Sequence, residues 1–235
     1  MVGDDEGVMG DGTVTAAHTA LLDRMAGLRL LPVVVLQDAG HAVPLARALV
    51  AGGLPVAEVT FRTAAAADSI RAMTDAGITT ADGSGLLVGA GTVVTPEQVD
   101  AAVAAGARFV VSPGLSRAVV ERCQEHGVLA LPGTVTATEV QAALAMGLRT
   151  VKFFPAGVSG GPAAIKALSA PFPQMSFVPT GGVTEANLAD YLALPSVVAA
   201  GGSWMVPADA VAAGDSATIE SLTASAVAAA RGAGA

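Results

Sequence analysis

The sequence of 235 residues predicts an α/β protein folded as a single (β/α)8 TIM barrel. Apolar residues make up 52% of the chain and charged residues 14%, which is typical of a large buried core with few exposed loops. From about residue 30 onward, short runs rich in Val or Leu alternate with Ala-rich segments. Eight such pairs can be counted, and eight is the repeat number of this barrel.

Each expected strand is short, and several are apolar on both faces, as parallel strands covered by helices are. In chain order the candidates are Leu31–Leu36, Ala57–Phe61, Leu86–Ala90, Phe109–Ser112, Leu129–Pro132, Thr150–Phe154, Ser176–Thr180 and Val197–Gly201. A doubly wound open sheet is the alternative, but it usually has fewer strands and a glycine-rich first turn. Because residues 37–40 lack a G-x-G-x-x-G motif, the barrel is favoured.

Capping and helix-breaking residues also support eight strand–helix pairs. Thr95 with Gln98, and Thr136 with Glu139, predict capping boxes at two helix starts. The other boundary residues are Pro44, Pro162 and Thr184 near helix starts, Gly52, Gly53 and Gly147 at helix ends, and Ser216 at the start of the last helix.

Composition restricts the domain organisation and the partners. Residues 1–17, rich in Gly and Asp, are expected to form a disordered acidic leader, and residues 18–235 a single catalytic domain. The early acidic residues argue against a signal peptide, and breaks by Pro, Gly and Ser argue against a membrane span. A net charge of -8 without basic clusters argues against nucleic-acid and membrane partners.

Cysteine and histidine usage indicates the compartment and the metal chemistry. The single cysteine, Cys123, excludes an internal disulfide and fits a cytoplasmic location. The three histidines lie far apart in the sequence and form no recognisable ligand motif. We therefore expect neither a metal nor another cofactor.

The interpretation of function depends on Lys152, one of only two lysines in the chain. It lies inside the expected buried strand Thr150–Phe154. Burial disfavours an ammonium ion and lowers the pKa of a lysine, in general, from about 10.4. A partly neutral amine attacks carbonyl groups and forms Schiff bases. The alternative is a structural cation at a strand end, paired with Glu58.

In such a barrel the functional groups lie at the carboxyl ends of the strands. Strand alternation places Glu58, Thr60 and Arg62 on one face. If Glu58 points inward, it shares the interior with Lys152 and can move protons for an imine-forming amine. A Glu58–Arg62 salt bridge at the rim is the alternative.

Glycines follow the seventh and eighth expected strands, at Gly181-Gly182 and at Gly202-Ser203. Backbone N–H groups there can bind an oxyanion without a net positive protein, and barrels often bind a phosphate at these two loops. The sequence therefore predicts a phosphate site between units seven and eight.

Seven short motifs between about residues 30 and 210 carry a resemblance to a known family. They are HAVP at 41–44, EVTFRT at 58–63, GAGTV at 89–93, SPGL at 112–115, KFFPA at 152–156, PTGG at 179–182 and GGSW at 201–204. In this order they resemble the 2-keto-3-deoxy-6-phosphogluconate (KDPG) and 4-hydroxy-2-oxoglutarate (KHG) aldolases, class I Schiff-base lyases on a (β/α)8 barrel. KFFPA and GGSW are the more specific motifs.

The resemblance implies a role for each matching residue. Lys152 would form the iminium with the C2 keto group of the substrate, and Glu58 would be the general acid/base. The other implied contacts are Arg62 and Thr92 to the pyruvyl carboxylate, Pro113 and Phe154 as pocket walls, and Gly181, Gly182, Gly202 and Ser203 to the phosphate. A homotrimer that uses no metal is also implied. The acidic leader and the linker at 79–85 depart from the family pattern.

We therefore predict a cytoplasmic class I aldolase that cleaves KDPG reversibly to pyruvate and glyceraldehyde 3-phosphate. One alternative is the same chemistry on KHG or on the galactonate epimer of KDPG. Another is a phosphate-binding barrel isomerase or synthase without an imine, and a third is a binder of phosphorylated ligands without catalysis. A covalent adduct between pyruvate and Lys152 separates the first two hypotheses from the others.

Overall fold

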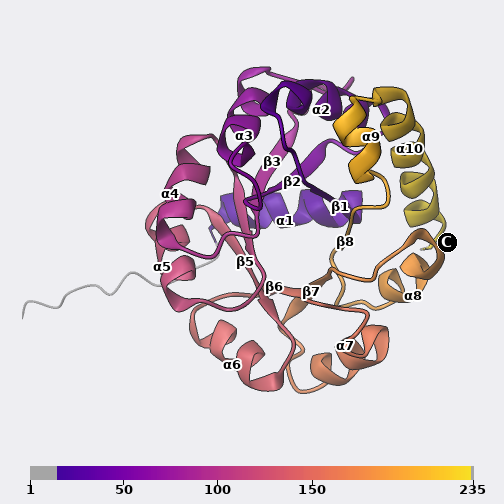
Figure 1. Ribbon diagram of the computed structural model, residues 1–235. Coiled ribbons are helices and arrows are strands. Elements are labelled where there is room, and N and C mark those ends of the chain that lie inside the picture. Colours follow the sequence, from indigo (N-terminus) through magenta and orange to yellow (C-terminus); the bar gives the residue numbers. More distant parts are fainter. Residues whose placement is uncertain (1–14, 234–235) are drawn as a thin grey trace, which may run out of the picture.

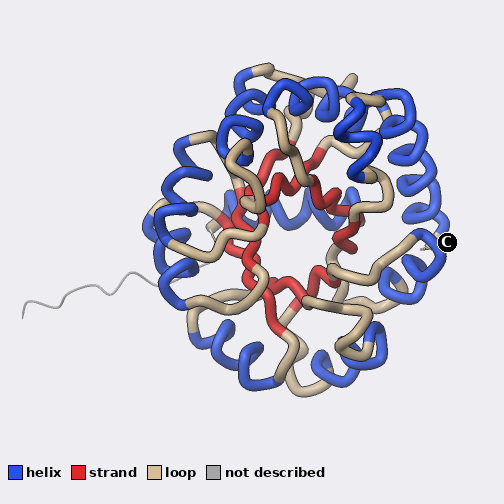
Figure 2. Tube along the Cα trace, viewed as in Figure 1, coloured by secondary structure: helices blue, strands red, loops and turns tan. Residues whose placement is uncertain are grey.

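The computed structural model describes residues 15–233 as a closed barrel of parallel strands inside a ring of helices (Figures 1 and 2). The strands are β1 (Leu30–Val34), β2 (Val56–Thr60), β3 (Leu87–Gly91), β4 (Phe109–Ser112), β5 (Leu129–Thr134), β6 (Thr150–Phe153), β7 (Ser176–Pro179) and β8 (Ala200–Gly202). They pair in the order β7-β6-β5-β4-β3-β2-β1-β8. Single parallel bridges, Phe177 to Val197 and Thr180 to Gly201, close the ring. The prediction of a (β/α)8 barrel is confirmed.

All eight predicted strands are present, most with ends shifted by one or two residues. The last differs most, because β8 begins at Ala200 rather than at Val197. Before that point the chain bonds to β7, with Val198 N donating to Phe177 O at 3.0 Å. Only from Ala200, which pairs with Leu30, does it join β1. The eighth strand is therefore short because Val197 and Val198, which were predicted to begin it, contact β7 and do not pair with β1.

The helices surround the strands (Figure 2). They are α1 (Ala16–Leu28), α2 (Ala42–Ala51), α3 (Ala66–Asp75), α4 (Pro96–Ala104), α5 (Arg117–Glu125), α6 (Ala137–Ala145), α7 (Gly161–Ser169), α8 (Leu188–Leu192), α9 (Ala208–Ala213) and α10 (Ser216–Gly232), with 3-10 turns η1 (Ala39–His41) and η2 (Glu185–Asn187). None of the helices in residues 15–233 combines the length and hydropathy needed to span a membrane.

The predicted caps are largely present. Thr136 and Glu139 form a reciprocal capping box at the start of α6. The box predicted at Thr95 is incomplete: Thr95 Oγ1 accepts from Gln98 N at 3.3 Å, but Gln98 Oε1 accepts from Val94 N at 2.7 Å rather than from Thr95 N. The helix expected after Gly181-Gly182 is only the turn η2 followed by the five residues of α8.

Helix α1 covers the end of the barrel at which the strands begin, and it lies behind the strands in Figure 1. Arg24 of α1 donates to the carbonyl of Pro55, just before β2, at 3.4 Å, and Met25 is buried in the core. The helix starts at Ala16, since Thr15 Oγ1 accepts from His18 N at 3.2 Å, and this is before the leader boundary predicted at residue 17. The rest of the predicted leader, residues 1–14, lies outside the described residues. The carboxyl ends of the strands remain open for a site.

Candidate active site

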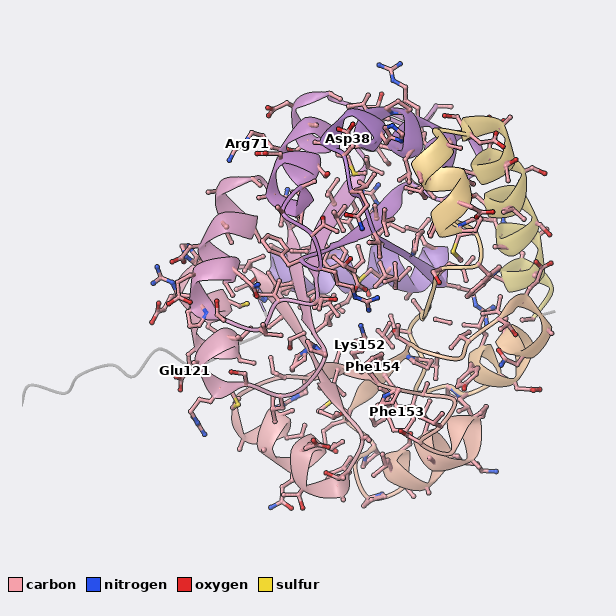
Figure 3. All side chains as sticks on the ribbon, in the orientation of Figure 1. Asp38, Arg71, Glu121, Lys152, Phe153 and Phe154 are labelled. Atoms are coloured by element: carbon pink, nitrogen blue, oxygen red, sulfur yellow. The ribbon has the colours of Figure 1, made fainter. Side chains whose placement is uncertain are left out.

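Lys152 and Glu58 meet inside the barrel, so Glu58 points inward, the condition under which the sequence placed the two side chains together. Lys152 Nζ, on β6, lies 3.6 Å from Glu58 Oε1, on β2. Lys152 is 4% exposed and Glu58 is 0% exposed. Figure 3 shows Lys152 near the centre of the ring of strands, with Arg71 and Glu121 at the periphery. Phe153, next in β6, packs edge-on against Phe177, with ring centroids 6.4 Å apart.

The Glu58 carboxylate is held without hydrogen bonds. Neither of its oxygens has a hydrogen-bond partner among the described residues, and 3.6 Å is beyond hydrogen-bond distance from Lys152 Nζ. Leaving a buried charged acceptor unpaired is costly, so such a group calls for a functional explanation. The arrangement suits a carboxylate that exchanges protons with a bound molecule or a water.

Small residues on β3 leave the space that Glu58 occupies. In the sheet Glu58 pairs with Gly89, and Thr60 pairs with Gly91. A Cβ atom at Gly91 would overlap Glu58 Oε1. The GAGT motif therefore has a steric role at the site, because any side chain at Gly91 would displace the carboxylate.

A cavity of about 300 Å³ opens next to Lys152 at the carboxyl ends of the strands. Seven of the predicted site residues line it: Arg62, Lys152, Phe154, Gly181, Gly182, Gly202 and Ser203. Among its described lining residues two are cationic and none is acidic, in a chain of net charge -8. The Phe154 ring lies beside the amine, with its centroid 4.9 Å from Lys152 Nζ (Figure 3). The cavity is therefore suited to an anionic ligand.

Arg62 and Thr92 are linked at the rim of this cavity. Arg62 Nε donates to Thr92 Oγ1 at 3.3 Å, and the Arg62 side chain is exposed, not paired with Glu58. Thr92 has a φ of 57°, a left-handed conformation that is uncommon for a β-branched residue. Backbone strain of this kind concentrates at functional sites. The rim salt bridge between Glu58 and Arg62 does not form.

Gly181, Gly182, Gly202 and Ser203 bring main-chain groups to the cavity lining. Gly181 and Gly182 both have a positive φ, of 88° and 83°. In the parallel bridge between Thr180 and Gly201 the Gly181 N–H points toward the Gly201 carbonyl, whereas the N–H groups of Gly182 and Ser203 donate to no other group within residues 15–233. Successive amides in such turns form concave sites for oxyanions. The predicted phosphate site is thus geometrically available.

Some lining residues were not predicted, and one predicted wall residue is elsewhere. Thr180 and the apolar residues Val33, Val35, Val206 and Ala208 also line the cavity. The PTGG motif indicates the place of Thr180 but not that the residue lines the cavity. Pro113 is not among the lining residues, and its carbonyl lies against Gly133 on β5. Its role as a wall therefore remains a prediction.

Lys152 and Glu58 are buried beside a cavity suited to an anion, at the carboxyl ends of the strands. These features define a class of protein: a (β/α)8 barrel enzyme equipped for Schiff-base chemistry. Groups of three or more His, Cys, Asp or Glu side chains that could hold a metal are not present in residues 15–233.

Comparison with known proteins gives the family. A family model for KDPG and KHG aldolases matches residues 21–222. The 2-dehydro-3-deoxy-phosphogluconate aldolase of Treponema pallidum is 48% identical over 203 residues, which cover 86% of this chain and 94% of the relative. The chain belongs to the KDPG and KHG aldolase family, and it is an aldolase, a carbon–carbon lyase.

Two solved structures of aldolases are also similar. The KDPG aldolase of Legionella pneumophila, with pyruvate captured at low pH as a covalent carbinolamine intermediate, has a TM-score of 0.80 at 40% identity, covering 85% of this chain and 94% of that one. The KDPG aldolase of Zymomonas mobilis, with 3-phosphoglycerate, has a TM-score of 0.79 at 40% identity, covering 88% and 95%.

Proposed function

We propose that the protein is a class I aldolase that cleaves KDPG reversibly to pyruvate and D-glyceraldehyde 3-phosphate through an iminium on Lys152. The observation that carries the proposal is the buried Lys152 Nζ, 3.6 Å from an otherwise unpaired carboxylate and open to a cavity with anion-binding groups. The covalent carbinolamine with pyruvate in the Legionella relative supports it.

The proposed reaction starts with attack of the Lys152 amine on the C2 carbonyl carbon of the substrate. Loss of water from the carbinolamine gives a protonated imine, which accepts electrons more readily than a ketone. Glu58 then removes the proton of the C4 hydroxyl, the C3–C4 bond breaks, and its electron pair becomes an enamine conjugated to the nitrogen. The aldehyde leaves, C3 is protonated, and water releases pyruvate from Lys152. Because Glu58 lies next to Nζ, one carboxylate serves all of these proton transfers.

Two separate groups of donors match the two anionic ends of KDPG. We assign the pyruvyl carboxylate to Arg62 and Thr92, which are already linked through the Arg62 Nε–Thr92 Oγ1 hydrogen bond. The phosphate is assigned to the amides of Gly181 and Gly182 and to Gly202 and Ser203. KHG, which has a carboxylate in place of the phosphorylated end, is the second candidate substrate because the family model includes KHG aldolases.

Trapping with borohydride tests the proposal. Reduction in the presence of pyruvate should add one reduced pyruvyl group, which peptide mapping places on Lys152. The matched control is Lys166→Ala, which removes the only other lysine, an exposed residue on α7, and should still form the adduct. Lys152→Ala should not form it. Absence of an adduct in the folded, unsubstituted protein would reject the Schiff-base mechanism and favour an isomerase or synthase.

We also expect a cytoplasmic homotrimer, as the family resemblance implies. Light scattering of the purified protein measures its mass against the 22.9 kDa of one chain. A mass of one chain would contradict the trimer while leaving the proposed chemistry untouched.

A further inference from the structure

A second cavity lies behind one wall of the active-site cavity. It measures about 270 Å³ and is lined by Val35, Leu36, Gln37, Asp38, His41, Ala208, Val211 and Ala212. These residues belong to two segments, the loop that follows β1 and the short helix α9 that follows β8. Val35 and Ala208 line both cavities. Helix α9 is thus a partition whose movement would change the shape of the active site directly.

Packing holds α9 through Ala210 and Val211, which are buried in the core, but on this side the helix borders the second cavity. The pairing of β1 with β8 reaches only Pro32 and Gly202, and beyond it the two segments are separated by the second cavity. The helix has only six residues, too few to be stable by itself.

His41 spans this gap. Its Nδ1 lies 2.8 Å from the carbonyl oxygen of Val211 in α9. A carbonyl oxygen can only accept, so Nδ1 carries the hydrogen. The imidazole also faces Gly214, the left-handed residue that ends α9, since a Cβ atom there would lie 3.7 Å from His41 Cε1.

The position of His41 is itself well determined. It ends the turn η1, in which Asp38 Oδ1 accepts from Gly40 N at 2.8 Å and His41 N donates to Asp38 O at 3.2 Å. Helix α2 follows at once, and its first residue, Ala42, is buried. His41 therefore projects from a fixed corner of the barrel onto α9 and adds a hydrogen bond to the packing of Ala210 and Val211.

We propose that His41 is a positioning residue: its hydrogen bond to Val211 holds α9 beside the second cavity. It thereby fixes Ala208, which lines the active site, and the preceding turn, in which Val206 N donates to Ser203 O at 3.0 Å, so that Ser203 is held for the oxyanion end of the substrate. The proposal rests on the proposed function in assigning the phosphate to Ser203. His41 touches neither Lys152 nor the active-site cavity, so its effect falls on substrate affinity and not on imine formation.

The test compares His41→Ala with His41→Asn, because the Asn side-chain N–H group lies close to the place of Nδ1 and can keep the bond. With KDPG, His41→Ala should raise KM about fivefold, the effect of one neutral hydrogen bond, and change kcat little. His41→Asn should restore KM. Borohydride trapping of pyruvate on Lys152 should be the same in all three proteins.

A second readout separates this proposal from the proposed function. Binding of inorganic phosphate, measured by calorimetry, needs no catalysis and should also weaken about fivefold in His41→Ala. Failure of the unsubstituted protein to form the pyruvate adduct would reject the proposed function, and the phosphate titration would still test His41. Equal phosphate affinity in the unsubstituted protein and His41→Ala, or a loss that His41→Asn does not restore, would overturn the positioning role.

Discussion

Gly91→Ala tests whether the barrel interior holds Glu58 where the chemistry needs it. The new Cβ would overlap Glu58 Oε1, and it would lie 2.6 Å from Glu58 Cγ and 2.8 Å from Cδ. Glu58 is fully buried, so the carboxylate has no free space to enter. The backbone of Gly91 is not in the left-handed region, which means that the effect of the substitution is steric.

The size of the effect follows from this overlap. Overpacking a filled core costs typically about 1–3 kcal/mol of unfolding free energy, and we expect a loss in that range. Moving a proton-transfer group by about 1 Å can reduce turnover roughly a hundredfold. Gly91→Ala should therefore lower kcat for KDPG cleavage about a hundredfold, since Glu58 is displaced relative to Lys152.

Gly89→Ala is the matched control on the same strand. Its Cβ would overlap the ring of Phe109 rather than Glu58, so it should cost comparable stability and leave kcat within about threefold. Gly27→Ala on α1 meets nothing within 4 Å and should raise stability by about 0.5–1 kcal/mol. Urea unfolding and a pyruvate-release assay give both quantities. If Gly91→Ala and Gly89→Ala reduce kcat equally, the reasoning about Glu58 is refuted.

Three further predictions concern charge and burial. Arg62→Ala should raise KM for KDPG roughly tenfold or more by removing a charged hydrogen-bond donor, and an unchanged KM would exclude a carboxylate contact. Hydrogen bonds from Arg122, and to a smaller extent from His126, lower the pKa of Asp100 from 3.8 to about 2. The ionised carboxylate therefore stabilises the fold above pH 3.8, and this stabilisation is lost as the pH falls toward 2. In Asp100→Asn, melting temperatures measured between pH 4 and pH 2 should therefore fall less steeply than in the unsubstituted protein, and an identical slope would contradict this. Burial raises the pKa of Cys123 to about 12, so a thiol reagent at pH 8 should label it only in urea, and rapid labelling of the native protein would contradict its burial.

Local sequence patterns were sufficient to predict the barrel and the central pair of the site. Parallel strands in a barrel are buried on both faces, so each leaves an uninterrupted apolar run that can be counted. Period-two alternation then puts Glu58 on one face with Thr60 and Arg62, and the structure shows that Glu58 faces Lys152 inside the barrel. Gly181, Gly182 and Gly202, which follow the seventh and eighth strands, line the part of the cavity where a phosphate is predicted, and Gly181 and Gly182 have the positive φ that glycine permits.

The features that could not be predicted depend on barrel closure. Helix α9 is only six residues long, so it carries too little periodicity to be recognised. The contact between His41 and Val211 joins residues 170 positions apart, and it exists only because β8 returns to pair with β1. Sequence alone marked His41 as a residue at a helix start, which it is. The contact of His41 with α9 arises because the barrel is closed, which makes the first and the last β–α units neighbours. In such barrels, residues of the first β–α unit can therefore position a ligand site that is formed by the last two units.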